Sequence, residues 1–316
     1  MSKDIEEIIN KVVQSAQLAM ILEVSAYPKP GNVHRTADFK DTKYEHFLAS
    51  TVAVLPQLQK AAKTGIKVAL SDISPSQAGI GNIIKDGVIE TAKWQKGGNT
   101  NLGILILMIP LVMAGAYTLM KNQDLKKFRT NIKLFTEATT PTDAINLYEA
   151  IKIAKPGGLG KTSYLDVTDP KSTKKIISYK IPLYKIFEMS ASYDKIAEEW
   201  ISNYKITFEI GAPYLQRVYR QTGNTNIAIV HTFLKILSTI PDTLIARKTS
   251  FSMAQKVSEK AKQILELGGL TTERGTKLLW EFDKELRKEG NKLNPGTTAD
   301  LTASSLMVAI FNGFKP

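Results

Sequence analysis

A carboxylate and a lysine flank a rigid turn near the start of the chain. Glu23 lies 18 residues after Ile5, five full turns of an α-helix, so it points the same way as the apolar side of that helix. If the helix continues this far, the carboxylate is interior and must be paired, hydrogen-bonded or metal-bound. The alternative is a helix that ends earlier and leaves Glu23 in water. Residues 27–35 form a Pro-Gly turn that carries Lys29. Acid and base together suggest a phosphate and metal site.

Other familiar catalytic motifs are missing from the sequence. The segment KPGGLGKT at residues 155–162 resembles a phosphate-binding loop, but that loop requires a glycine where Lys155 stands. No dinucleotide-binding glycine pattern, HExxH motif or GxSxG elbow is present. The lack of cysteine excludes disulfides and thiolate chemistry. The three histidines are too scattered to predict a metal cluster, and we interpret His231 as a hydrogen-bonded core residue.

The elements that must position these residues are helices. Apolar residues recur at helical spacing in the first twenty positions, and caps and glycine stops recur along the chain. Strand patterns are weak, and no Asn-Gly or Asp-Gly hairpin joins two strands. We therefore predict an all-α protein that forms a single large helical domain over residues 1–316. The 19 uncharged residues Leu102–Met120 are long enough to span a membrane. We interpret them instead as a buried central helix.

The net charge of +12 indicates a polyanionic partner such as nucleic acid, an acidic membrane or a phosphorylated metabolite. Residues 151–185 hold eight lysines against two aspartates, a local surplus of +6. We expect this segment to be a long basic loop over the surface. The first residues are acidic where a signal peptide would be basic. We therefore expect a cytoplasmic protein.

Four blocks of the sequence resemble one enzyme family. They are EVSAYPKPGNV at residues 23–33, GGNTNLG at 97–103, DTLIARK at 242–248 and NPGTTADL at 294–301. Their order and composition are similar to those of the triphosphoribosyl-dephospho-coenzyme A synthase family. One block alone is a weak signal, but four in order across nearly the whole chain are specific.

The resemblance implies an all-helical transferase. Its reaction moves the triphosphoribosyl group of ATP to the 2′-hydroxyl of 3′-dephospho-CoA and releases adenine, in prosthetic-group biosynthesis. It implies that the partners are small-molecule substrates, and that the protein binds neither nucleic acid nor a membrane. Formation of a homo-oligomer is left open. Cleavage at ribose C1′ passes through a cation that a carboxylate can stabilise. The triphosphate implies Mg²⁺ held by oxygen ligands.

The same resemblance assigns the site residues. The carboxylates for catalysis and metal binding are Glu23, Asp242 and Asp300, with Glu23 as base or metal ligand. The phosphate-binding residues are Lys29, Arg247 and Lys248, and those for adenine or ribose are Asn99, Asn101 and Asn294. Asp300 has an alternative role as a helix cap, Asn99 and Asn294 as turn residues, and Lys248 as a solvated charge.

Departures from the family pattern concern the acceptor more than the donor. Asn101-Leu102 stands where the family has His-Lys, and His34 stands near a position that is commonly acidic. The alternatives are therefore ATP-dependent glycosyl transfer to another acceptor, for example in pterin cofactor biosynthesis, or a non-catalytic nucleotide-binding protein. A nucleic-acid binder rests on charge alone.

Overall fold

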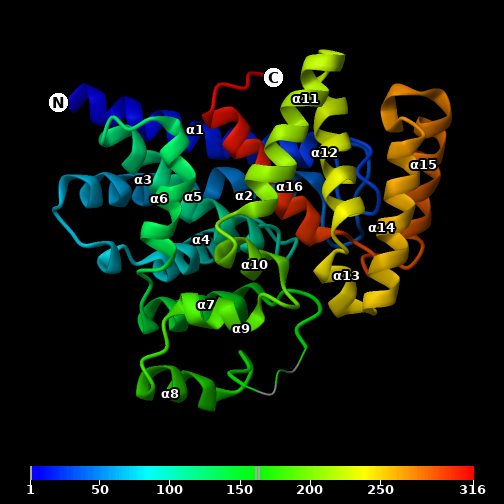
Figure 1. Ribbon diagram of the computed structural model, residues 1–316. Helices are drawn as coiled ribbons and strands as arrows, with labels where there is room; N and C mark the ends of the chain where they lie inside the picture. Colours follow the sequence, from blue (N-terminus) through cyan, green and yellow to red (C-terminus); the bar gives the residue numbers. More distant parts are fainter. Residues whose placement is uncertain (1, 161, 163) are drawn as a thin grey trace. The chain divides into compact units, whose positions relative to one another are not determined.

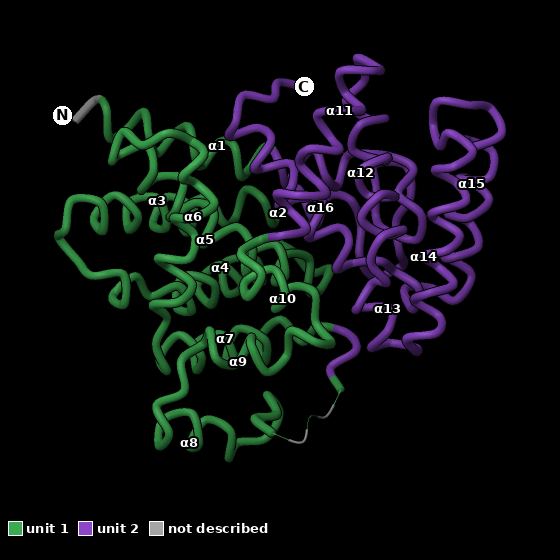
Figure 2. The backbone as a smooth tube through the Cα atoms, in the orientation of Figure 1, with its two compact units in different colours: residues 1–18, 49–156, 160–204 green, residues 19–48, 157–159, 205–316 purple. Residues whose placement is uncertain are grey.

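The computed structural model describes residues 2–160, 162 and 164–316 (Figure 1). These ranges contain sixteen α-helices, and their extended pairing is limited to one isolated bridge between His34 and Ala37. The predicted all-α class is confirmed. The chain divides into two compact units, coloured in Figure 2. Unit 1 comprises Met1–Leu18, Ala49–Pro156 and Gly160–Tyr204, and unit 2 comprises Ala19–Leu48, Gly157–Leu159 and Lys205–Pro316.

Two helices contribute residues to both units, and the next ones along the chain belong to unit 1. The shared helices are α1 (Ser2–Ser25) and α2 (Tyr44–Ala53). Those of unit 1 are α3 (Leu55–Leu70), η1 (Pro75–Gln77), α4 (Ile80–Trp94), α5 (Leu102–Met120), η2 (Leu125–Lys127), α6 (Phe128–Thr136), α7 (Pro141–Ala154), α8 (Pro170–Ser178), α9 (Leu183–Ser190) and α10 (Lys195–Ile201).

The core of unit 1 is built around α5, which packs against α3, α4, α6 and α10. It is the one helix of the described ranges that is long and apolar enough to cross a membrane, and 83% of that stretch is buried inside the protein. The predicted buried helix is confirmed. Pro110 lacks the N–H that would bond the Ile106 carbonyl four residues earlier. The Trp200 indole donates to that carbonyl instead at 3.1 Å, and the Tyr204 hydroxyl donates to the Leu107 carbonyl at 2.9 Å.

The expected long loop over residues 151–185 is wrong in part. Helix α7 continues to Ala154, and α8 and the start of α9 lie inside the segment, so its described residues outside helices are 155–160, 162, 164–169 and 179–182. Helix α8 forms because the Asp169 side chain accepts from the Lys171 amide at 2.9 Å and Pro170 occupies the first helical position. Lys161, one of the eight lysines, lies outside the described residues.

Unit 2 is organised around a helix that is buried almost throughout, α16 (Gly296–Phe311). The remaining elements are the π-helical η3 (Ile206–Gly211), α11 (Ala212–Thr222), α12 (Thr225–Thr239), α13 (Thr243–Lys248), α14 (Phe251–Glu266), η4 (Gly269–Thr271) and α15 (Glu273–Arg287). Helix α16 packs against η3, α11, α12 and α13. A Cβ on Gly211 would lie 1.9 Å from the Ser305 Oγ, so only glycine allows η3 and α16 to approach this closely.

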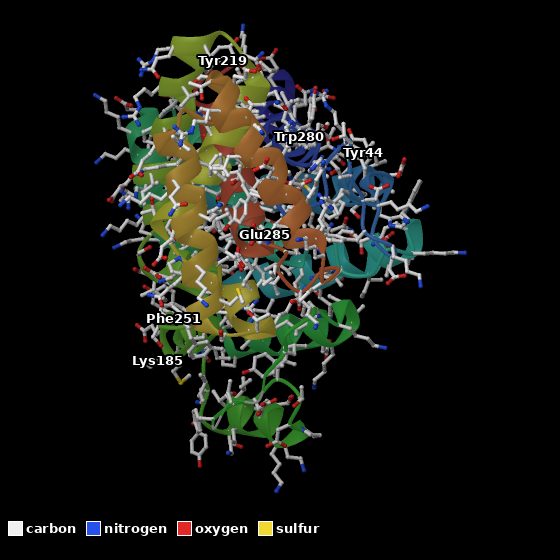
Figure 3. All side chains as sticks on the ribbon, turned by 90° about the vertical axis from the view of Figure 1, so that its right-hand side faces the viewer. Tyr44, Lys185, Tyr219, Phe251, Trp280 and Glu285 are labelled. Atoms are coloured by element: carbon white, nitrogen blue, oxygen red, sulfur yellow. The ribbon has the colours of Figure 1, made fainter. Side chains whose placement is uncertain are left out.

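Helix α15 is amphipathic. Leu279, Phe282 and Leu286 are buried, whereas Glu285 is exposed (Figure 3). This pattern fixes which side chains of α15 reach the interior of unit 2.

His231 is a core residue, as predicted. It is 6% exposed, and its Nε2 accepts a hydrogen bond from the Leu270 amide at 2.9 Å. Burial lowers its pKa to about 4. The single domain over residues 1–316 stays a prediction.

Candidate active site

Glu23 lies in the last turn of α1, and the helix does not fray before it. The side chain is buried, with 1% exposure, and Lys29 is fully buried at 0%. Lys29 Nζ donates to Glu23 Oε1 and, at 3.3 Å, to Asn32 Oδ1. The predicted interior carboxylate is confirmed, and the solvent-exposed alternative is wrong. The chain supplies the partner that a buried carboxylate requires.

Burial moves the pKa values of this pair towards each other. Desolvation raises the pKa of Glu23, and the charge and hydrogen bond of Lys29 oppose that rise. Desolvation lowers the pKa of Lys29, and the charge and hydrogen bond of Glu23 oppose that fall. Perturbed acid and base groups side by side are common where proteins carry out proton transfer.

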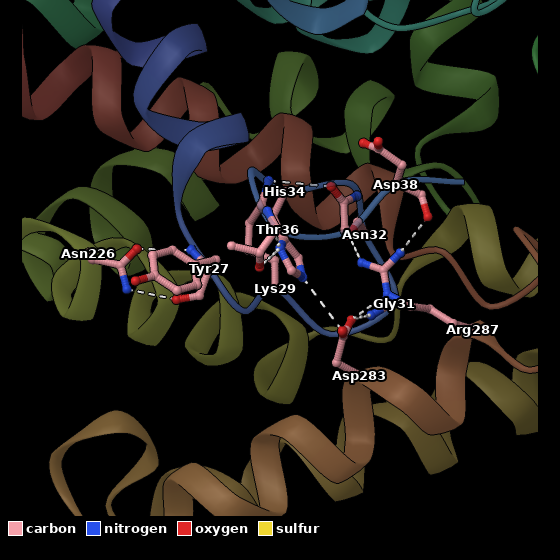
Figure 4. Close-up of polar contacts among 10 residues, drawn as sticks. All are labelled: Tyr27, Lys29, Gly31, Asn32, His34, Thr36, Asp38, Asn226, Asp283 and Arg287. Atoms are coloured by element: carbon pink, nitrogen blue, oxygen red, sulfur yellow. Dashed lines mark hydrogen bonds and ion pairs between the residues drawn. The ribbon is translucent and has the colours of Figure 1, made fainter. Parts of the chain in front are cut away.

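Helix α15 fixes the turn that carries Lys29 (Figure 4). The Gly31 amide and Arg287 Nε both donate to Asp283 Oδ1 at 2.9 Å, and Arg287 Nη2 donates to the Asn32 carbonyl. His34 Nε2 lies 3.5 Å from Asp283 Oδ2. Asp283 therefore ties the turn to α15 through Gly31 and His34, and Arg287 of the same helix adds the contact with Asn32.

Two further features hold this turn in place. Gly31 has φ +70°, and a Cβ there would lie 2.8 Å from Leu286 Cβ, so the Pro-Gly sequence is required by both conformation and space. At the start of the turn, the Asn226 side chain of α12 accepts from the Tyr27 amide at 2.9 Å and donates to the Tyr27 carbonyl at 2.7 Å (Figure 4).

The last family-like block meets the first one directly. Asn32 Nδ2 donates to Asn294 Oδ1 at 2.8 Å, two residues before α16 begins. Asp300 lies in the second turn of α16, and its charge raises the pKa of the neighbouring Lys29, against the larger effect of burial. The N-cap residue of α16 is Pro295 and Asp300 lies a full turn inside the helix, so the alternative role of Asp300 as a helix cap is wrong.

Asp242 is the N-cap of α13, and all its acceptor capacity is used. Its Oδ1 accepts from the amides of Leu244 and Ile245 at 2.9 and 3.0 Å. Its Oδ2 accepts from the amide and hydroxyl of Thr298 at 2.7 and 2.8 Å. A carboxylate has about four lone-pair sites, so these bonds leave none for a cation. Burial raises the pKa of Asp242, and the hydrogen bonds from Thr298 and Ile245 oppose this. The geometry makes Asp242 the link between α13 and α16.

Two basic residues lie at the end of α13. Arg247 is exposed, and Lys248 is half-buried with its Nζ donating to the carbonyl of Asn291 at 2.9 Å and to the Asn291 side chain. Burial lowers the pKa of Lys248. Lys248 is therefore a cation held by Asn291, and its role in phosphate binding stays a prediction.

The remaining two predicted residues belong to unit 1. Asn99 Oδ1 accepts from the Leu102 amide at 3.1 Å, which shapes the start of α5. Asn101 is buried, at 3% exposure, and donates to Thr91 Oγ1 at 2.9 Å. The assignment of Asn99 and Asn101 to adenine or ribose stays a prediction.

The predicted magnesium site has no preformed cluster to support it. In the part of the chain that is described, no three His, Asp or Glu side chains are grouped to hold a metal. Glu23 is paired with Lys29, and Asp242 has no free lone pair. The carboxylates in this arrangement do not fit a resident metal centre, and Mg²⁺ stays a prediction.

Sequence reasoning missed the residues that position the turn, namely Asn226, Asp283 and Arg287. Asp283 and Arg287 form an i, i+4 charge pair, which is too common on helices to single out a site. Asn32 was visible inside the first block, but its partner Asn294 lies 262 residues away.

The described chain is all-helical, and in unit 2 it holds a buried acid–base pair and two basic residues at the end of α13. The chain matches the profile of the ATP:dephospho-CoA triphosphoribosyl transferase family over residues 9–315. It belongs to this family, and the predicted family, enzyme class and transferase activity are confirmed.

Individual relatives agree with this assignment. The chain is 25% identical over 311 residues to Protein CitXG of Leuconostoc mesenteroides subsp. cremoris, covering 96% of this chain and 58% of that protein. It is 22% identical to the 2-(5''-triphosphoribosyl)-3'-dephosphocoenzyme-A synthase of Klebsiella pneumoniae, covering 95% and 91%. A solved structure from Archaeoglobus fulgidus, assigned as a triphosphoribosyl-dephospho-CoA synthase, is similar with TM-score 0.61 and 25% identity, covering 85% of this chain and 100% of that one.

Proposed function

We propose that this chain moves the triphosphoribosyl group of ATP to the 2′-hydroxyl of 3′-dephospho-CoA, with release of adenine. The observation that carries the proposal is the buried Glu23–Lys29 pair, which joins Asn294 of the last family block through Asn32. Family membership supports the reaction class. A cytoplasmic location and a homo-oligomer stay predictions.

Glu23 is the proposed base. In this transfer the bond between ribose C1′ and adenine breaks, a bond from the acceptor 2′-oxygen to C1′ forms, and the hydroxyl proton leaves as adenine gains one. The sugar passes through an oxocarbenium-like state, which a carboxylate stabilises. Lys29 favours the charged form of Glu23 and thereby keeps it able to accept the proton. The raised pKa of Glu23 makes it a stronger base than an ordinary carboxylate.

The phosphates of ATP are assigned to basic residues of unit 2. Arg247 and the fixed Lys248 are the proposed contacts, and Asp242 positions them by capping their helix. Lys29 is fully buried and committed to Glu23, so we assign it to holding the carboxylate rather than to a phosphate.

The test is adenine release, followed by chromatography with ATP, Mg²⁺ and 3′-dephospho-CoA. We expect Glu23→Gln to lower kcat by about 100-fold or more. ATP binding should be retained by calorimetry, because the glutamine side chain keeps the shape of the glutamate and can still accept from Lys29. Wild-type protein that releases no adenine with any acceptor would overturn the proposal.

A second acceptor is favoured by one observation. Leu102 occupies the place of the family's lysine and is buried at 5% exposure, so no cation stands there. A pterin-type acceptor, which lacks the phosphates of dephospho-CoA, is the proposed alternative. Faster adenine release with pterin acceptors than with dephospho-CoA would establish it, and the reverse order would exclude it.

A further inference from the structure

A three-residue piece of the basic segment belongs to unit 2. Residues up to Pro156 and from Gly160 pack within unit 1, whereas Gly157–Leu159 packs with unit 2 (Figure 2). Its neighbours there are the two basic residues at the end of α13. This contact brings the glycine-rich motif against the residues that the proposed function assigns to phosphate.

The contact is close at both glycines, but only Gly158 combines close neighbours with a positive φ, because the neighbour of Gly157 is the flexible end of Lys248. A Cβ on Gly157 would lie 2.8 Å from Lys248 Cε. A Cβ on Gly158 would lie 3.1 Å from Lys248 Cγ and 3.2 Å from Arg247 Cβ. Gly158 also has φ +73°, a conformation that glycine adopts without strain. Gly160 of the same motif meets nothing within 4 Å and has no positive φ, so nothing in the packing requires glycine there.

The backbone of this turn offers hydrogen-bond donors beside fixed positive charge. The amides of Gly157, Gly158 and Leu159 donate to no other described residue. Lys248 Nζ is held by Asn291, and Arg247 adjoins it in the chain. The carboxylate nearest to them in sequence, Asp242, uses its oxygens for four hydrogen bonds. Backbone amides of a turn next to cations form a typical anion-binding arrangement.

We propose that the Gly157–Leu159 turn, together with Arg247 and Lys248, binds the oligophosphate chain of a substrate. The inference rests on the proposed function for its choice of ligand, because both ATP and dephospho-CoA carry linked phosphates. The turn supplies amide donors, and Arg247 and Lys248 supply charge, in the way that glycine-rich loops and basic side chains share phosphate recognition elsewhere.

Binding of inorganic tripolyphosphate to the full-length protein tests the inference without any turnover. We expect Gly158→Ala to weaken binding at least about tenfold, since it displaces the turn and its charge-assisted hydrogen bonds. The matched control is Gly160→Ala, which should stay within about threefold of wild type because its Cβ meets no neighbour. Arg247→Gln, at an exposed position, should also weaken binding about tenfold and make it less sensitive to salt. Unchanged affinity in Arg247→Gln, or equal effects of the two glycine variants, would overturn the inference.

Titration with ATP and with dephospho-CoA identifies the source of the phosphates. A loss confined to ATP in Gly158→Ala assigns the turn to the donor, and a loss confined to dephospho-CoA assigns it to the acceptor; either supports the inference. Binding of tripolyphosphate that depends on Gly158, in a protein that releases no adenine, would leave this inference standing and overturn the proposed function. If wild type and Gly158→Ala release adenine at the same rate at subsaturating substrate, the proposed function stands and this inference is overturned.

Discussion

The stability of the protein should depend on both members of the buried pair, Glu23 and Lys29, being present. Removing one partner leaves a charge without compensation in the interior, which costs about 3–5 kcal/mol. We therefore expect Lys29→Met to lower the free energy of unfolding by about this amount in urea denaturation. The double variant Glu23→Gln with Lys29→Met should recover more than half of the loss, because no unpaired charge remains.

The matched control for this cycle is Lys85→Met, whose ammonium pairs with Glu149 at a more exposed position. It should change the free energy of unfolding by less than about 1 kcal/mol. Equal effects of Lys29→Met and Lys85→Met would show that burial of the Glu23–Lys29 pair has no energetic weight.

The lowered pKa of His231 leads us to expect a lower free energy of unfolding in acid. Its pKa falls from 6.5 to about 4 on folding, so the unfolded chain binds more protons than the native one between these values. The free energy of unfolding should therefore be fully retained above pH 6.5. It should decline by about 3 kcal/mol as the pH falls towards about 4. Protonation also turns Nε2 from an acceptor into a donor facing the Leu270 amide.

The check is urea denaturation at several pH values for wild type and His231→Gln. The glutamine can accept from Leu270 but does not titrate, so its profile should be flatter by the amount that His231 contributes. His46→Gln serves as the control at a less buried position. A His231→Gln profile parallel to that of wild type would contradict the assignment.

Helix α15 positions the site through one buried carboxylate, that of Asp283. Asp283 accepts from Gly31 and Arg287 and neighbours His34, so it holds the turn of Lys29 to the helix (Figure 4). We expect Asp283→Asn to reduce the free energy of unfolding by about 2–4 kcal/mol, since Arg287 loses its counter-charge. Hydrogen exchange should increase in residues 27–36 before it increases elsewhere in unit 2.

Glu285→Gln on the same helix is the control, because Glu285 is exposed (Figure 3). It should change stability by less than about 0.5 kcal/mol. If Asp283→Asn leaves exchange in residues 27–36 at the wild-type level, α15 does not anchor the turn.

The whole chain carries a prediction about cooperativity. The two compact units are built from interleaved segments, and α1 and α2 contribute to both. A single domain should lose protection in α5 and in α16 at the same urea concentration, because neither unit could unfold while the other stays native. Hydrogen exchange with mass spectrometry across a urea series measures both. If α5 and α16 lose protection at clearly different urea concentrations, the prediction of a single domain is wrong and the chain forms two domains.

Local sequence information was sufficient for the all-α class, for the bounds of α5 and for the interior position of Glu23. Periodicity alone placed the carboxylate on the apolar side of α1, and the uncharged run Leu102–Met120 gave α5 with the observed bounds. The family resemblance added the reaction and selected seven of the nine site residues from what proved to be unit 2. Helix α8 was missed because the segment was interpreted from its lysines, and neither the cap at Asp169 nor the single buried apolar residue Ile176 was considered.

The roles of the carboxylates were decided only by tertiary structure. Sequence gives a residue type and a direction along its own helix, whereas the use of each lone pair depends on partners far away in the chain. From the sequence, Asp242 could not be distinguished from a metal ligand. The structure shows that Thr298, 56 residues later, donates two hydrogen bonds to its Oδ2. In the sequence, Asp283 is one of many charged residues on a helix. Only the structure shows that it accepts a hydrogen bond from Gly31, 252 residues earlier. Helical periodicity is a local property, and the pairing of buried charges is set by packing between segments that no local pattern connects.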